Sequence, residues 1–287
     1  MDGIILINKE AGITSFGVVS RIRKIFNIKK VGHCGTLDPE ATGVLPVMIG
    51  QATKLSKYLV EHDKEYIARV KFGVKTDSAD SEGNIIEVDN FKLDIEKEAF
   101  YREASFKLVG KQKQIPPMYS AIKLNGKKLY EYARDGIEIE REARDIEIYS
   151  IDIENIDYDK NEIVFRTKCS KGTYIRTLCE SLAETIGTIG YMKELTRIQV
   201  DNFRIEDSIK LSELEIMDDK ESKIISIEKL FENVKKVVLN DRKTELFLNG
   251  VKLSTDLENG VYRVYNGSKF VGLGVVKDGL LKRDIII

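Results

Sequence analysis

The residues best suited to chemistry lie in one glycine-rich stretch, GHCGTLDPEATG, which runs from Gly32 to Gly43 between two short apolar runs. It presents a carboxylate, Asp38, followed directly by Pro39. The proline fixes its own φ and biases Asp38 towards an extended backbone, and Leu37 can anchor the loop in a core. A loop constrained in this way is suited to hold a single reactive group in place. Taken alone, the same residues are also typical of an ordinary Asp-Pro turn.

A second stretch, CSKGTYIRTL from Cys169 to Leu178, predicts the start of a helix with basic residues around it. We expect Thr173 to cap this helix, so that Tyr174 and Arg176 emerge from its first turn. Such a corner attracts carboxylates and phosphates, and an arginine paired with Asp38 would keep that carboxylate ionised. An isolated Thr-Tyr-x-Arg is more commonly a helix start with a surface arginine. Spacing alone does not bring it to Asp38.

Composition narrows the class of protein. The 287 residues are enough for one large domain and a small one, and the 42% hydrophobic and 32% charged content is typical of a globular chain. No apolar run reaches transmembrane length, and the N-terminal run is too short for a signal peptide. Three cysteines without a CxxC pair favour reduced thiols and a cytoplasmic location. With His33 and His62 the only histidines, the sequence predicts no metal site.

The distribution of charge indicates a nucleic-acid partner, although the net charge is only −1. Acids are scarce or absent in three basic bands, at 21–58, 106–129 and 163–178, which contain seven, six and four Lys or Arg residues. The tail 235–287 carries ten bases and six acids. If these bands converge, they form one positive surface for a phosphate backbone.

Hydrophobic periodicity predicts an α+β domain followed by a small β-rich module. We expect strands at 3–8, 44–49, 66–73, 144–158, 162–170 and 197–204, and helices at 15–26, 54–60, 94–109, 127–134 and 173–186. The polar segment 77–84 lacks the full acidic spacing of a calcium loop and is predicted to be a connector. The acidic segment 206–232 is expected to hold short helices. From residue 237 onward, Asn-Gly and Asp-Gly pairs separate short predicted strands.

Four motifs together resemble those of the TruB family of tRNA pseudouridine synthases. They are GHCGTLDPEATG at 32–43, KEYIARV at 64–70, IPPMYSAIK at 115–123 and CSKGTYIRT at 169–177. The resemblance implies an α+β pseudouridine-synthase domain with a mixed or antiparallel sheet over residues 1–234, including an RNA-gripping insertion at 112–147. Residues 235–287 are similar to the family's PUA-like RNA-binding module.

The resemblance also implies an activity: isomerisation of uridine 55 in the tRNA T-loop to pseudouridine, without cofactor or metal. By this analogy Asp38 is the nucleophile, Arg176 pairs with it, and Tyr66 stacks on the flipped base and can assist proton transfer. The analogy further assigns Tyr174 to the lining of the uridine pocket, Leu195 to a contact with the uracil, and His33 to stacking within the refolded T-loop. Aromatic faces would compensate for the stacking that the extruded base loses, at roughly 1–3 kcal/mol per base.

Three other interpretations remain open at this stage. An RNA-binding or RNA-folding protein could bind RNA in the same groove, the one formed around these motifs, without catalysing a reaction. Such a protein would not require a paired carboxylate. A glycoside hydrolase usually needs two facing carboxylates, and only Asp38 stands in such a motif. A guide-RNA-dependent relative is disfavoured by the short N-terminus and the lack of a basic tail. We therefore expect a cytoplasmic, monomeric enzyme that acts on the tRNA T-arm without a guide RNA and without a membrane.

Overall fold

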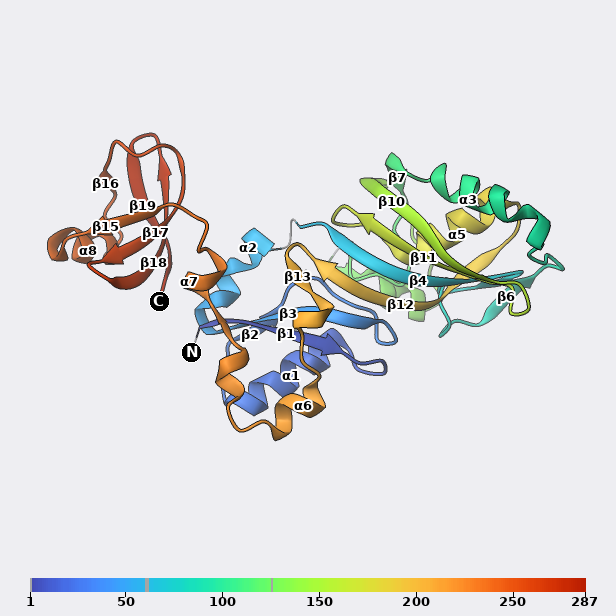
Figure 1. Ribbon diagram of the computed structural model, residues 1–287, viewed down its shortest axis with the longest axis horizontal. Coiled ribbons are helices and arrows are strands. Elements are labelled where there is room, and N and C mark those ends of the chain that lie inside the picture. Colours follow the sequence, from blue (N-terminus) through green and yellow to red (C-terminus); the bar gives the residue numbers. More distant parts are fainter. Residues whose placement is uncertain (1, 60–61, 125) are drawn as a thin grey trace.

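The computed structural model describes residues 2–59, 62–124 and 126–287. The chain forms an elongated molecule in which a small C-terminal module lies at one end of a long, twisted sheet (Figure 1). Among the described residues no helix is both long and apolar enough to cross a membrane.

Within the described ranges, the large sheet has the strand order β14-β1-β3-β12-β4-β11-β10-β7, with β2 beside β3 and β13 beside β12. Most neighbours are antiparallel, and β3 and β12 are parallel, so the sheet is mixed. Its strands are β1 (Gly3–Lys9), β2 (Val31–His33), β3 (Thr42–Ile49), β4 (Lys64–Phe72), β7 (Gly110–Gln114), β10 (Arg144–Asp157), β11 (Glu162–Cys169), β12 (Gly190–Val200), β13 (Phe203–Arg204) and β14 (Ile225–Ser226).

Strands β3 and β12 join two halves of this sheet. Their parallel contact is short: only Thr42 and Gly43 of β3 pair with residues of β12. Gly43 has a φ of +107°, and a Cβ added there would lie 2.1 Å from the Arg197 carbonyl oxygen. Only glycine permits both the backbone angle and this close approach. The Asp38 loop therefore enters the sheet at its narrowest junction.

Helices cover one face of each half. These are α1 (Ser15–Phe26), α3 (Glu98–Phe106), α5 (Ile175–Ile186) and α6 (Leu211–Ile216), and their apolar residues share a single core with the sheet. Helix α1 begins where Thr14 accepts a hydrogen bond from the Gly17 N–H (2.9 Å) and ends at Asn27 in the left-handed conformation. Short helices α2 (Ser56–Leu59), α4 (Leu129–Arg134) and α7 (Ile227–Leu230) and the 3₁₀ turns Gly50–Leu55, Ile95–Lys97, Ile205–Asp207 and Lys220–Lys223 complete this part.

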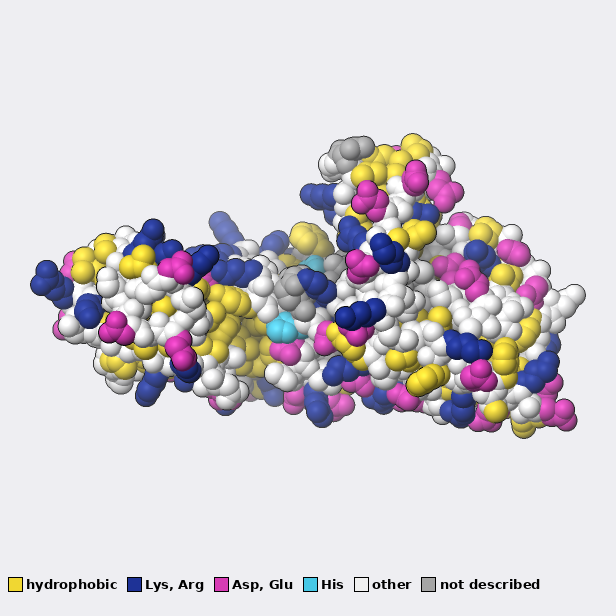
Figure 2. Space-filling model, turned by 90° about the horizontal axis from the view of Figure 1, so that it is seen from above, with side chains coloured by type: hydrophobic (Ala, Val, Ile, Leu, Met, Phe, Trp, Pro, Cys, Tyr) yellow, Lys and Arg dark blue, Asp and Glu magenta, His cyan; other side chains and the backbone are white. Residues whose placement is uncertain are grey.

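Two hairpins project from the large sheet. One pairs β5 (Val74–Thr76) with β6 (Ile85–Val88), and the other pairs β8 (Lys123–Leu124) with β9 (Lys127–Lys128). The second belongs to the insertion expected at 112–147, which stands out from the body of the molecule (Figure 2). On the same face, lysine and arginine side chains lie along the molecule from the C-terminal module towards the base of this projection (Figure 2).

The C-terminal module is a separate sheet of order β15-β17-β18-β19-β16, with α8 (Asp241–Leu248) beside it. Its strands are β15 (Lys236–Leu239), β16 (Leu253–Ser254), β17 (Gly260–Asn266), β18 (Lys269–Lys277) and β19 (Leu280–Ile286). Leu273 and Ile285 of this sheet pack in one apolar cluster with Val44 of β3, and the Tyr58 hydroxyl donates to Asp284 (2.5 Å). The module thus packs on the large domain, where β19 contacts the 3₁₀ turn Gly50–Leu55 that follows β3.

Several element boundaries differ from those expected. Strand β12 begins at Gly190, seven residues before the predicted strand 197–204, and the turn at Asp201 separates it from β13. The segment after residue 237 also contains α8, which the prediction of short strands missed. The predicted helix 127–134 begins as β9 and is helical only from Leu129. The predicted helix 54–60 ends at a residue outside the described ranges.

Candidate active site

Asp38 and Arg176, which are 138 residues apart in the sequence, meet at the junction of the two half-sheets. The Arg176 Nε lies 3.1 Å from one carboxylate oxygen of Asp38, and Nη2 lies 3.3 Å from the other. The arginine side chain is 5% exposed and the aspartate side chain 36%, so the arginine is buried while part of the carboxylate stays exposed to solvent. This two-point contact fixes the orientation of the carboxylate as well as its position.

A second aspartate, Asp80, completes a network around the same arginine. The Arg176 Nη1 lies 3.5 Å from the Asp80 carboxylate and donates to the Ser78 carbonyl (3.3 Å). Asp80 lies in the turn that the sequence analysis treated only as a connector. Nothing in the local pattern distinguishes it; its role follows from the backbone hydrogen bond from the Met192 N–H to the Ala79 carbonyl, which brings the turn to β12.

Burial is the main influence on the Asp38 carboxylate. It raises the pKa of Asp38 above the ordinary value; Arg176 lowers this pKa, Asp80 raises it further, and Lys9 lowers it. The sequence analysis expected the arginine to keep the carboxylate ionised. The net upward direction shows that desolvation outweighs the arginine, because the loop excludes water from most of the group.

Buried polar side chains hold the backbone of the Asp38 loop. The Ser15 hydroxyl donates to the Leu37 carbonyl (3.0 Å) and accepts from the Leu37 N–H (2.9 Å). The Lys9 ammonium donates to the Pro39 carbonyl (2.7 Å), and this lysine is fully buried. Burial lowers the pKa of Lys9 to about 8. Asp38 is thus held between two anchored neighbours, and the sequence analysis identified neither Ser15 nor Lys9.

Tyr66 lies on β4, close to the carboxylate, and is 7% exposed. Burial raises its pKa to about 12, and the nearby Arg197 guanidinium partly opposes that shift. The charge of Asp38 raises the pKa of Tyr66 and of Tyr174, although burial is the largest cause for both. The structure therefore brings together Asp38, Tyr66, Tyr174 and Arg176, which spacing alone did not.

Tyr174 is the N-cap residue of α5, and a side chain from the insertion holds its backbone. The Gln114 amide donates to the Tyr174 carbonyl (3.1 Å) and accepts from the Tyr174 N–H (2.8 Å). The Tyr119 carbonyl accepts from the Arg176 Nη2 (2.7 Å). Thr173 does not cap the helix as predicted, because its hydroxyl donates back to the Ser170 carbonyl (2.9 Å).

The two remaining candidates lie on strands that flank the loop. Leu195 pairs with Ala68 in the middle of the sheet and is 9% exposed. His33 ends β2 and is half-buried, and its Nδ1 has no hydrogen-bond partner among the described residues. Burial, with the charge of Arg197, lowers the pKa of His33 and favours a neutral ring.

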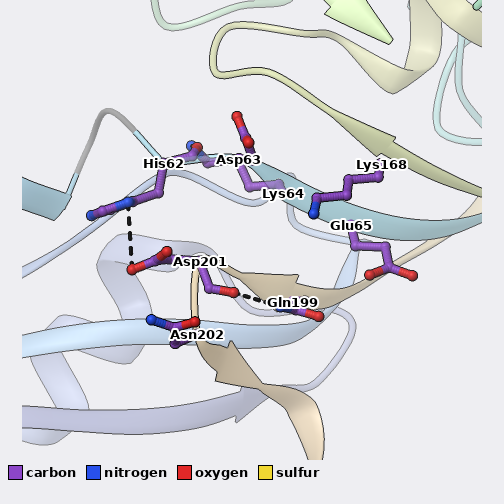
Figure 3. A pocket seen from close by; sticks show the side chains of 8 residues that line it. All are labelled: His62, Asp63, Lys64, Glu65, Lys168, Gln199, Asp201 and Asn202. Carbon is purple, nitrogen blue, oxygen red and sulfur yellow. Dashed lines mark hydrogen bonds and ion pairs between the residues drawn. The ribbon is translucent and has the colours of Figure 1, made fainter. Parts of the chain in front are cut away.

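Two cavities open near these residues. One of about 20 Å³ is lined by Asp38, Asp80 and Glu82, among others. The other, of about 250 Å³, lies at the start of β4 and at the β12–β13 turn, where His62 pairs with Asp201 at 3.4 Å (Figure 3). In the described part of the chain, no group of three His, Cys, Asp or Glu side chains is arranged to hold a metal ion.

Comparison with known proteins decides the family. Residues 23–175 match the model of the TruB family pseudouridylate synthase N-terminal domain, and residues 236–283 match that of pseudouridine synthase II TruB, C-terminal. The chain belongs to the TruB family. It is therefore an isomerase of the pseudouridine-synthase type, and the expected α+β fold with a small C-terminal β module is confirmed.

TruB relatives match this chain over nearly its whole length. It is 44% identical to "tRNA pseudouridine synthase B" of Clostridium kluyveri, covering 97% of this chain and 96% of the relative. It is 41% identical to the protein of the same name from Alkaliphilus oremlandii, covering 97% and 94%.

Among solved structures, the fold resembles a chain of a Cbf5-Nop10-Gar1 complex, with a TM-score of 0.69, 25% identity and coverage of 99% of this chain and 83% of that one. It also resembles a chain of an H/ACA RNP bound to a substrate RNA containing 2′-deoxyuridine, with a TM-score of 0.71, 22% identity and coverage of 99% and 85%. The second likeness shows the fold alone.

Proposed function

We propose that this enzyme converts uridine 55 in the T-loop of tRNA to pseudouridine, with Asp38 as the nucleophile. The observation that carries the proposal is the Asp38–Arg176 pair, in which the arginine is buried and part of the carboxylate stays exposed, in a chain whose relatives are named tRNA pseudouridine synthase B. A protein that only binds RNA has no need for an aimed, partly desolvated carboxylate.

The chemistry requires one bond to break and another to form on the same nucleoside. The N1–C1′ bond is cleaved, the uracil rotates, and C5 bonds to C1′; C5 loses a proton and N1 gains one, so substrate and product are isomers. Asp38 either adds covalently, to C1′ or to C6, or drives formation of a glycal. Both routes need an ionised carboxylate at the start, which Arg176 favours against the effect of burial.

The other candidate residues then act on the extruded base. Tyr66 stacks on the uracil and assists proton transfer, Tyr174 and Leu195 line the pocket, and His33 stacks within the refolded T-loop. The cavity beside Asp38 is far smaller than a nucleoside, so entry of the base requires the surrounding segments to part. Enclosure afterwards protects the intermediate from hydrolysis.

We divide the chain into a catalytic domain, residues 1–234, and a C-terminal module, residues 235–287. Two further regions are proposed to contact RNA: the insertion at 112–147 and the C-terminal module. The insertion at 112–147 places Lys127 4.7 Å from the ring of Tyr132, and Lys128 5.2 Å from the ring of Tyr130. Lysine side chains that alternate with aromatic rings in this way are suited to binding single-stranded or looped RNA. The module 235–287, with its excess of basic residues, would bind another part of the same tRNA.

Release of tritium from C5 tests the proposal, because forming the C5–C1′ bond expels the C5 hydrogen. Purified protein is mixed with T-arm stem-loop RNA that carries [5-³H]uridine. We expect release at a stoichiometry of one per stem-loop for the wild type and none for Asp38→Asn, with stem-loop affinity unchanged within a few-fold. Release by Asp38→Asn at the wild-type rate would refute the nucleophile assignment.

A further inference from the structure

Arg197 is a buried cation that the proposed chemistry has not used. It is 1% exposed and heads the largest fully buried side chains. In the part of the chain that the structure describes, no carboxylate pairs with it; the groups whose charge or hydrogen bonding affects it most are Tyr66 and Cys34. Desolvating a guanidinium is costly unless hydrogen bonds satisfy its N–H groups. The partners of these N–H groups therefore show what the side chain holds in place.

The contacts of Arg197 show what it does to the backbone. Its Nη2 donates to the Gly35 carbonyl (3.1 Å), its Nη1 to the Thr36 carbonyl (3.5 Å) and its Nε to the Val44 carbonyl (2.9 Å). Gly35 and Thr36 precede Asp38, and Val44 follows it. A single guanidinium thus binds the carbonyls at both ends of the loop that carries the nucleophile.

The position of Arg197 in the sheet links that loop to Tyr66. On β12 it pairs with Gly43 of β3 on one side and with Tyr66 of β4 on the other. Its guanidinium also lies beside the Tyr66 side chain, where its charge and hydrogen bonding lower the pKa of that phenol against the larger effect of burial. The same residue therefore touches the strand before which Asp38 lies and the aromatic residue proposed to hold the base.

We propose that Arg197 is a positioning residue for the isomerisation: its buried guanidinium holds both ends of the Asp38 loop and the Tyr66 hydroxyl in one fixed arrangement. This inference rests on the proposed function. A planar guanidinium reaches these carbonyls and the phenol at once, whereas the single nitrogen of a lysine reaches at most part of the set. A lysine at position 197 keeps the positive charge but loses the several N–H donors that the planar guanidinium presents.

Arg197→Lys tests the inference, with Arg69→Lys as its matched control. Arg69 also links β4 to β12, through an ion pair with Glu194 (2.9 Å), but has no contact with the loop. We measure thermal unfolding, affinity for the T-arm stem-loop, the single-turnover rate of tritium release, and amide hydrogen exchange over residues 35–44.

For Arg197→Lys we expect a folded protein with stem-loop affinity within threefold, loop amides that exchange at least tenfold faster, and a single-turnover rate at least 30-fold lower. In a Tyr66→Phe background, Arg197→Lys should lower the single-turnover rate by a factor at least threefold smaller, because part of its effect acts through the Tyr66 phenol. Arg69→Lys should change none of these quantities beyond twofold. A purely structural role would lower the unfolding temperature without this coupling.

A single-turnover rate within threefold of wild type, or loop exchange that does not change, would overturn the inference. Wild-type protein that binds the stem-loop but releases no tritium would instead overturn the proposed function, and the exchange data would still decide whether Arg197 holds the loop. If Arg197→Lys does not fold, ¹⁵N spectra of the wild-type arginine side chains replace it: the Arg197 Nε–H should exchange slowly and shift when stem-loop is added. Rapid exchange or no shift would refute the role.

Discussion

Replacing Arg176 by lysine tests the aiming of the carboxylate. The arginine contacts Asp38 through two nitrogens at 3.1 and 3.3 Å and also binds Asp80 and two backbone carbonyls. The single nitrogen of a lysine keeps at most one of the two contacts to Asp38. A charge-assisted hydrogen bond is worth about 1.5–3 kcal/mol, and the carbonyls of Ser78 and Tyr119 lose a donor as well.

A loss of about 3 kcal/mol of transition-state stabilisation corresponds to a rate roughly 100-fold lower. We therefore expect Arg176→Lys to lower the single-turnover rate of tritium release by about that factor, with stem-loop affinity within a few-fold. Because Arg176 lowers the pKa of Asp38, a weaker contact should also move the acid limb of the pH–rate profile to higher pH. Both changes come from weakening the same two contacts between Arg176 and Asp38.

Arg166→Lys is the control for that experiment. Arg166 also contacts two carboxylates, Glu65 at 3.2 Å and Glu154 at 2.7 Å, but its side chain is 41% exposed. Exposed pairs contribute little, so its rate should stay within twofold of wild type. An Arg176→Lys rate within threefold of wild type, with an unmoved acid limb, would contradict the reasoning.

Three further predictions, with Gly12→Ala as the control for the last, concern residues around the Asp38 loop. Asp80→Asn removes a like charge that raises the pKa of Asp38, so the acid limb should move to lower pH while the rate falls by about tenfold as the network loosens; an unmoved limb would argue against the network. The pKa of Lys9 falls from 10.5 to about 8 on folding, so the unfolded chain binds more protons between these values and stability should rise with pH there. The rise should approach 3 kcal/mol in order of magnitude, and urea unfolding from pH 7 to 10 should show that Lys9→Met lacks it. Gly43→Ala forces a Cβ to within 2.1 Å of a carbonyl oxygen and should lower the free energy of unfolding by more than about 3 kcal/mol; Gly12→Ala, with a positive φ and open space, should cost about 1 kcal/mol.

Local sequence signals predicted the elements whose residues determine their own conformation. The helix predicted at 15–26 forms as α1, because Thr14 caps it with a side chain that needs only the N–H three residues later. The strands predicted at 144–158 and 162–170 also form, as β10 and β11, and they pair with each other antiparallel. By contrast, the start of β12 carries Lys193 and Glu194, whose charges conceal the strand, and α8 is too polar to stand out before an Asn-Gly pair.

The sequence predicted the reactive residues of the site but not the residues that hold them in place. Asp38 and Arg176 stood in recognisable motifs. Asp80, Lys9 and Arg197 carry no local signal, because a charged residue in a polar turn or at a strand end is ordinarily exposed. Only the packing of distant strands around the loop buries them and gives them their partners, so no reading of neighbouring residues reveals them.

The proposed activity is tested most directly by mapping pseudouridine in a T-arm stem-loop incubated with the purified chain and no other RNA. We predict quantitative conversion at position 55 alone, abolished by Asp38→Asn and by replacing that uridine with cytidine. Product that forms only when a guide RNA is supplied, or at other uridines while position 55 stays unmodified, would contradict it.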